Sequence, residues 1–73
     1  MFIDTKSAST ARGSNQGFVV MAEGEDINES IGGEISTIEG TLEFLKSFTN
    51  NQDALAEYMP DSDYSKVTRL YID

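Results

Sequence analysis

The chain has 73 residues, thirteen acidic and five basic, which give a formal charge of −8, and it contains neither cysteine nor histidine. A chain of this length buries only about 60–65% of the surface that its unfolded form exposes, so it has no room for a deep enclosed pocket. The missing residue types exclude a disulfide framework and make zinc, copper and non-haem iron sites improbable, so we expect no metal and no other cofactor.

Charge and hydropathy also limit the partners and the location of the chain. No apolar run approaches the roughly 18–20 residues that span a bilayer, and the first residues lack a signal-peptide pattern, so we expect a cytoplasmic protein without a membrane partner. Direct binding to nucleic acid is disfavoured, because phosphate contacts require lysine and arginine. Since 38% of the residues are hydrophobic, we expect the charge on a folded single domain, residues 1–73, and not on a disordered tail.

The first third of the chain predicts two strands separated by a polar connection. Residues 1–5 indicate a short strand, and residues 6–17, which are polar and without periodicity, indicate a loop or a long hairpin connection. Residues 17–23 predict a further strand, because Phe18, Val19 and Val20 are aromatic or β-branched. Its two faces are both apolar, as in a central strand or one that contacts a partner.

An acidic segment follows, for which two interpretations remain open. Residues 23–34 carry five carboxylates around two apolar residues, Ile27 and Ile31. In the first interpretation this segment is a solvated loop. In the second, the two isoleucines alternate inward toward a turn at the glycine pair 32–33, and residues 34–35 return as the second arm of a hairpin.

The clearest predicted element is a helix that begins with Ser36-x-x-Glu39, a spacing in which the serine hydroxyl and the glutamate each satisfy a free amide. At about 100° per residue, its apolar side chains cover an arc of about 160°, which we expect to face the core. This arc consists of Ile38, Leu42, Phe44, Leu45 and Phe48. Gly40 weakens the first turn by about 1 kcal/mol relative to alanine.

Two short elements complete the prediction. Residues 49–51 end the first helix and cap a second, short helix that stops at Pro60. Its apolar face consists of Ala54, Leu55, Tyr58 and Met59. Residues 66–72 alternate as a strand, with Leu70 and Ile72 on one side and Val67, Arg69 and Tyr71 on the other.

Together these elements predict an α+β fold. We expect a three- to four-stranded, mostly antiparallel sheet, with one main helix and one short helix packed on one face. Such a sheet leaves its second face to water or to a partner.

No constellation of residues supports catalysis or a metal site. Residues 61–65 begin like a calcium loop, but Lys66 and Ile72 occupy the places that require glycine and a bidentate glutamate. The glycines form no nucleotide-binding motif, and the serines have no histidine as a partner. Clustered glutamates on a polar segment are expected to stay ionised and hydrated, so they do not divide into an acid and a base. We therefore predict that the chain is not an enzyme.

The remaining signal is the acidity itself, which we interpret as a protein-binding surface. Alternate residues of an extended segment repeat at about 6.6–6.8 Å, and such a row of carboxylates can occupy lysine and arginine sites that receive a nucleic-acid backbone. Aromatic residues anchor many interfaces, and Tyr58, Tyr64 and Tyr71 are candidate anchors. The predicted partner-binding residues are Glu23, Glu25, Asp26, Glu29, Glu34, Asp61, Asp63 and Tyr64. Solubility alone is the other explanation for the charge.

In size, acidity, lack of catalytic chemistry and α+β organisation, the chain resembles phage-encoded inhibitors of host defence, anti-CRISPR and anti-restriction proteins among them. The resemblance rests on general character and on no motif, so no residue role follows from it. It implies a nucleic-acid mimic in the host cytoplasm, monomeric or homodimeric, that binds a basic surface of a nucleic-acid-binding host protein.

A different kind of interaction module is the alternative. An immunity or antitoxin-type partner, or an assembly subunit, would bind through an uncovered sheet face or an edge strand. In that case Phe18, Val20, Val67 and Tyr71 would matter more than the carboxylates.

Overall fold

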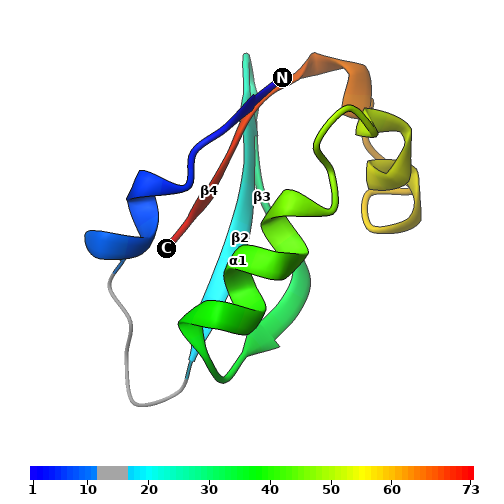
Figure 1. Ribbon diagram of the computed structural model, residues 1–73. Coiled ribbons are helices and arrows are strands. Elements are labelled where there is room, and N and C mark those ends of the chain that lie inside the picture. The colour runs from blue at the N-terminus through cyan, green and yellow to red at the C-terminus, as the bar shows by residue number, and fades with distance from the viewer. Residues whose placement is uncertain (12–16) are drawn as a thin grey trace.

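The computed structural model describes residues 1–11 and 17–73, and its centre is a four-stranded sheet with the strand order β1-β4-β2-β3 (Figure 1). The strands are β1 (Phe2–Ile3), β2 (Phe18–Gly24), β3 (Ile27–Ile35) and β4 (Val67–Ile72). The β1–β4 pair is parallel, whereas the β4–β2 and β2–β3 pairs are antiparallel. The predicted α+β fold is therefore confirmed, and β2 lies within one residue of its predicted position.

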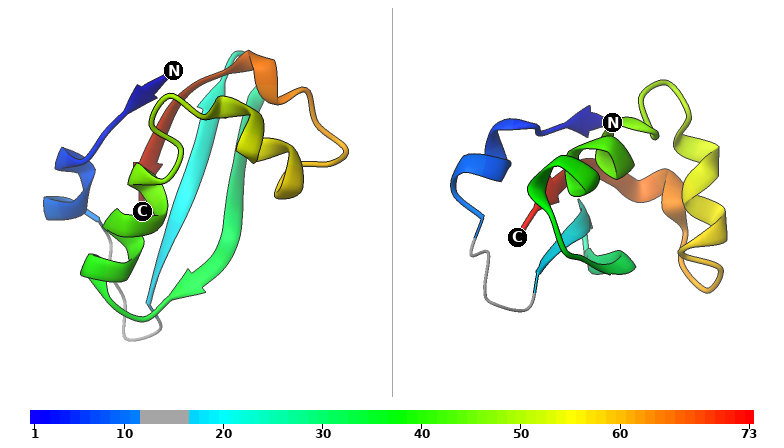
Figure 2. Two further views of the ribbon diagram at one scale, coloured as in Figure 1. Left: turned by 45° about the vertical axis from the view of Figure 1, so that its right-hand side comes forward. Right: turned by 60° about the horizontal axis from the view of Figure 1, so that its bottom comes forward.

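Helix α1 (Ile38–Lys46) covers one face of this sheet (Figure 2). Three short 3₁₀ turns accompany it, η1 (Lys6–Ser9), η2 (Gln52–Glu57) and η3 (Tyr64–Lys66). The predicted second helix corresponds to η2, but it is a 3₁₀ turn, and Asn51 at its start makes no side-chain cap. The packing of Leu55 and Met59 into the core holds this short segment on the sheet.

The covered face of the sheet, α1 and η2 together enclose the core. Its ten apolar side chains are at most 2% exposed. They are Val20, Ala22, Ile31, Leu45, Phe48, Leu55, Met59, Val67, Leu70 and Ile72. Burial of each larger side chain among them is worth about 1.5–3 kcal/mol, so this cluster is the main stabilising feature of the fold.

The predicted alternation of the last strand is wrong at Val67. The pairing of β2 with β4 shifts between Glu23 and Gly24, and Val67 lies opposite Gly24. Because of this irregularity, Val67 joins Leu70 and Ile72 on the covered face and is only 2% exposed.

Helix α1 begins one residue later than the capping pattern predicts. Thr37, and not Ser36, is the N-cap, and its hydroxyl oxygen accepts the amide of Gly40 at 3.1 Å. Thr41, which is fully buried, donates its hydroxyl to the Thr37 carbonyl at 2.6 Å. A Cβ atom on Gly40 would lie 3.1 Å from both Ile35 and Thr37, so the glycine permits close packing of the first turn against the end of β3.

The acidic segment is neither a solvated loop nor a hairpin that turns at the glycine pair. It is the turn and second arm of the β2–β3 hairpin, in which Gly24 lies opposite Ile27 and the two turn residues are Glu25 and Asp26. Asp26 has a φ of 62°, a left-handed conformation that aspartate tolerates better than most residues. Ile27 and Ile31 do point toward the core, as the hairpin interpretation predicts.

The glycine pair lies inside β3. Gly32 and Gly33 have φ values of 76° and 71°. A Cβ atom on Gly32 would lie 2.5 Å from the ring of Phe44, whereas one on Gly33 would meet nothing within 4 Å. Gly32 is therefore needed both for its backbone conformation and for the close approach of α1.

At the edge of the sheet opposite β3, Ser7 in η1 forms hydrogen bonds beside β4. Its hydroxyl oxygen accepts the amide of Ile72 at 2.7 Å and donates to the carbonyl of Asp4 at 2.8 Å. Ser7 is 7% exposed, and its bond to Ile72 is buried. The amide of Ile72, which the short strand β1 does not reach, is satisfied in this way.

Candidate protein-binding site

Arg69 organises the uncovered face of the sheet. Its guanidinium lies 2.9 Å from the Asp4 carboxylate and 3.1 Å from that of Glu23, and it stacks 4.2 Å above the ring centroid of Tyr71. The hydrogen bond from Arg69 holds the pKa of Asp4 below its ordinary value. Glu23, one of the predicted partner-binding residues, is thus engaged in an ion pair within the sheet.

Four of the eight predicted residues come together at the turn of the hairpin. Glu25 and Asp26 form the turn, Glu29 follows on β3, and Asp63 approaches from the segment that precedes η3. These four residues are here called the acidic end. With Ile27, Ser62 and Lys66 they line a pocket of about 210 Å³. Two segments that are more than thirty residues apart in sequence therefore contribute carboxylates to one place.

Local hydrogen bonds orient two of these carboxylates. The hydroxyl of Ser62 donates to Glu29 and ties the loop before η3 to β3. The amide of Ser65 donates to Asp63 at 3.1 Å, and the hydroxyl of Ser65 does so as well. The bond from this hydroxyl is the main reason that the pKa of Asp63 lies below its ordinary value. Glu29 and Asp63 are thereby held beside the same pocket.

The acidic end keeps most of its negative charge within the described part of the chain. Lys66 is the basic residue that lines the pocket, so four carboxylates and one ammonium group leave three net negative charges. The described ion pairs all belong to Arg69, and none involves the acidic end. A second hollow of about 410 Å³, lined by Glu25, Asp26, Ser65, Lys66 and Thr68, adjoins the first. This arrangement favours the approach of cationic groups.

The other predicted residues do not extend this cluster into a single row. Glu23 lies opposite Asn28 and Arg69 on the uncovered face, whereas Glu29 lies opposite Ala22 on the covered face. Glu34 is beyond the glycine pair, at the far end of β3, and Asp61 is exposed in the loop before Ser62. The alternation of side chains along a strand is the reason that neighbouring carboxylates of this segment diverge.

Tyr64 has a structural contact in place of a free hydroxyl. It packs against the core, and its hydroxyl donates to Asp53 at 2.9 Å. This bond raises the pKa of Tyr64 above its ordinary value. Its role as an interface anchor stays a prediction, and the geometry gives it a clear second role in positioning η3 against η2.

The alternative set of interface residues is corrected at two positions. Val20 and Val67 are at most 2% exposed and lie beneath α1 and η2, so a partner cannot contact them on the folded chain. Phe18 is half-buried against the core. Of that set, Tyr71 lies on the uncovered face, together with Phe2, which is 62% exposed.

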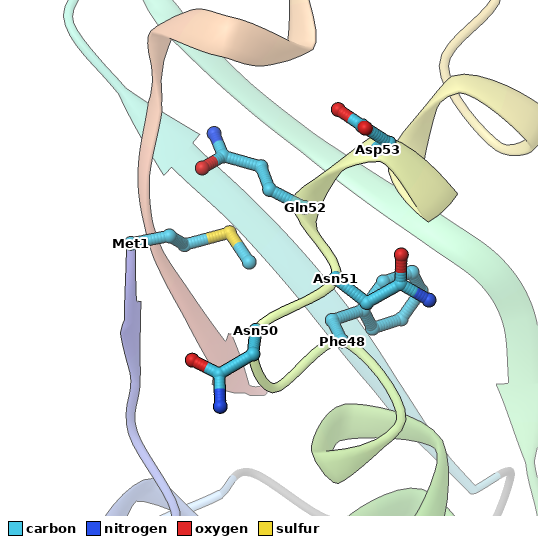
Figure 3. Close-up of a pocket in the computed structure, with 6 residues that line it drawn as sticks. All are labelled: Met1, Phe48, Asn50, Asn51, Gln52 and Asp53. Carbon is cyan, nitrogen blue, oxygen red and sulfur yellow. The ribbon is translucent and has the colours of Figure 1, made fainter.

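A separate hollow of about 390 Å³ lies between Met1, Phe48 and residues 50–53 (Figure 3). The side chain of Met1 extends toward this segment in the close-up. The amide nitrogen of Gln52 is already used, because it donates to the carbonyls of Tyr64 and Val67 at 3.0 and 3.1 Å. These two bonds hold η2 against η3 and the start of β4, and Asp53 contributes the carboxylate among the residues that line the hollow.

Within residues 1–11 and 17–73, no three carboxylates lie close enough together to hold a metal ion. In the same residues, no helix is both long and apolar enough to cross a membrane. Comparison with models of known protein families gives no match, and comparisons with curated proteins and with solved structures give no significant match.

Proposed function

We propose that the chain is a non-enzymatic inhibitor whose acidic end occupies a basic, nucleic-acid-binding surface of another protein, in the manner of phage anti-defence proteins of the anti-CRISPR or anti-restriction type. The observation that supports this most directly is the convergence of Glu25, Asp26, Glu29 and Asp63 around one lysine. A solubilising charge needs no such convergence, because carboxylates spread over the surface serve equally well.

The rest of the chain strengthens the field at this end. Arg69 is neutralised by its bonds to Asp4 and Glu23, and the formal charge of the chain is −8. Complementary charge accelerates the encounter of two proteins and sets their register. Occupation of lysine and arginine side chains by these carboxylates would exclude the phosphates that otherwise bind there.

Affinity capture tests this proposal. The immobilised chain is exposed to a bacterial lysate at low salt, and bound proteins are eluted with salt or with a short DNA duplex. We expect the captured proteins to be nucleic-acid-binding proteins that both eluents release. Salt releases them because the Debye length falls from about 10 Å at about 0.1 M salt to about 3 Å at about 1 M. DNA releases them because it competes for the same basic surface.

A pair of charge-matched variants locates the contact. The triple variant Glu25→Lys, Asp26→Lys, Glu29→Lys should lose the captured proteins. The control Glu39→Lys, Glu43→Lys, Glu57→Lys changes the charge equally at exposed positions of α1 and η2 and should retain them. Retention that is independent of salt, or capture by the first variant equal to that by the control, would overturn the proposal.

A further inference from the structure

Among the residues that the structure describes, no strand pairs with the outer edge of β3. β3 is the last strand of the sheet, and β2 is its neighbour on the inner side. No backbone hydrogen bond joins its outer side to any other described segment. Asn28 and Ser30 are exposed, and the left panel of Figure 2 shows β3 at the margin of the sheet. An open edge of this kind is a template for a further strand.

The pairing pattern identifies which backbone groups face outward. Val19 and Asp73 exchange both of their backbone hydrogen bonds, at 3.4 and 3.0 Å. The odd-numbered residues of β2 therefore bond to β4, and the even-numbered ones bond to Ile27, Glu29 and Ile31 of β3, which lie opposite them. The amides and carbonyls of Asn28 and Ser30 consequently point away from the sheet.

The carboxylates beside this edge select the charge of an incoming strand. Glu29 projects onto the covered face, where it lines the pocket of about 210 Å³ with Asp26 and Asp63. A residue of an added strand directly opposite Glu29 would project onto the same face, within about 4.5–5.5 Å at the β-carbons. β3 itself contains no lysine or arginine, so a basic side chain is the complement at this position.

The same carboxylate opposes pairing with a second copy of the chain. An inward-pointing charge on an edge strand is a common device against edge-to-edge association. In an antiparallel pair of copies over residues 27–31, the two Glu29 carboxylates would lie close together, and each copy carries a formal charge of −8. At the other end, the left-handed conformations of Gly32 and Gly33 interrupt the regular edge after Ile31.

We propose that an extended, lysine- or arginine-rich segment of the partner adds antiparallel to β3 between Ile27 and Ile31. Its backbone bonds to Asn28 and Ser30, and a basic side chain opposite Glu29 enters the pocket of the acidic end. This inference rests on the proposed function and specifies how the basic partner is bound. Backbone pairing supplies the geometry, and the carboxylates supply the selection for charge.

Three peptides of alternating lysine and valine, nine residues long, test the proposal by NMR titration. In the predicted register the valines lie opposite Asn28 and Ser30, so their amides face β3, and the lysine amides face away. One peptide is unmodified, one is N-methylated at the valine amides, and one is N-methylated at the lysine amides. All three carry the same charge.

We expect the valine-methylated peptide to bind at least about tenfold more weakly than the lysine-methylated one, because it alone lacks the donors that pair with β3. Hydrogen exchange at the amides of Asn28 and Ser30 should slow in the complex with the unmodified peptide. Equal affinity of the three peptides, any other ranking, or the absence of binding would overturn strand addition. None of these results depends on the capture experiment, which tests the charge of the acidic end separately.

Two variants of the protein complete the test. Ser30→Pro removes an outward amide, and proline is tolerated on an edge strand where its nitrogen faces solvent. It should weaken the unmodified peptide at least about tenfold while thermal unfolding shows a folded chain. Glu29→Gln, which keeps an acceptor for Ser62, should weaken it by a smaller factor that vanishes at high salt. Full affinity of both variants, or a stable dimer of the free chain in sedimentation, would overturn the proposal.

Discussion

The two ends of the β2–β3 hairpin differ in what holds their residues in place. At the open end, where β2 begins and β3 runs into α1, Gly32 lies against the ring of Phe44 and Gly40 packs closely on Ile35 and Thr37. At the turn end, Glu25 and Asp26 are exposed and line two adjoining hollows. At one end of β3, close packing therefore restricts which residues are tolerated. At the other end, the exposed turn places no such restriction on them. Substitutions should therefore separate stability from binding along the length of β3.

The largest loss of stability is expected for Gly32→Ala at the packed end. The new Cβ atom would overlap the ring of Phe44, and alanine is strained at a φ of 76°. We expect a loss of about 3 kcal/mol in the free energy of unfolding, measured by urea denaturation. Gly33→Ala is the control, because it has the same backbone strain without the overlap, and should cost about 1 kcal/mol. Equal losses would show that Phe44 does not restrict this end.

Arg69→Met tests the boundary between the two ends, because Glu23 lies only two residues before Glu25, the first residue of the turn, yet is paired. The variant removes the charge-assisted bonds to Asp4 and Glu23 and keeps much of the packing on Tyr71. We expect a loss of about 1–2 kcal/mol, since these bonds are partly exposed to water. A loss below about 0.3 kcal/mol would show that the ion pair of Glu23 contributes no more to stability than the exposed carboxylates of the turn.

The pH dependence of unfolding sharpens the same point. The bond from Arg69 lowers the pKa of Asp4 in the folded chain. The contribution of ionised Asp4 to stability is therefore complete above the pKa of about 3.9 that aspartate has in the unfolded chain. This contribution is lost as the pH falls through the lower pKa of Asp4 in the folded chain. Denaturation between about pH 5 and pH 2 should show a smaller decline for Arg69→Met than for the original chain. Asp63 has a shift of the same sign and contributes equally to both curves.

Thr37→Ala is expected to have a smaller effect at the packed end. It removes the cap on the amide of Gly40 and should cost about 1 kcal/mol, whereas Ser36→Ala should change the free energy of unfolding by less than about 0.5 kcal/mol. Chemical denaturation of the two variants decides between the observed cap and the one that the sequence pattern favours. A larger loss for Ser36→Ala than for Thr37→Ala would show that Ser36 is the N-cap, as the sequence pattern predicts.

The smallest effect on stability is expected at the turn. The double variant Glu25→Gln, Asp26→Asn keeps the shapes of both side chains, and asparagine tolerates the left-handed conformation of position 26. Its free energy of unfolding should stay within about 0.5 kcal/mol of the original, while capture of basic proteins falls. If unfolding instead shows a loss above about 1 kcal/mol, these carboxylates support the fold, and the contrast between the two ends disappears.

Sequence patterns predict the fold better than they predict the site. Periodicity identifies α1, β2 and β4, because long apolar patterns reflect burial in the core. The turn of the hairpin is missed because a glycine pair is the stronger turn signal, while the observed turn uses Glu25 and Asp26. Val67 and Thr41 are misplaced or missed for related reasons, since a register shift and a buried hydroxyl depend on tertiary contacts.

The candidate site is predicted in part. Alternation about Ile27 and Ile31 would have placed Glu29 on the covered face and Asn28 and Ser30 on the other, once the segment was read as a strand. No local pattern indicates that Asp63 returns to Glu29, because that approach depends on the loop that Ser62 joins to β3. The edge position of β3 likewise follows from strand order, which sequence alone does not establish.

The bond between Ser7 and Ile72 limits the addition of further strands to the sheet. Sheet polymers lengthen when both margins accept a neighbour, and here the β4 side ends in a two-residue strand and a serine that already occupies the next amide. A segment bound at β3 would therefore have no comparable strand edge for a further segment on the β4 side of the described sheet. The stoichiometry should accordingly stop at one ligand per chain, without propagation into fibres.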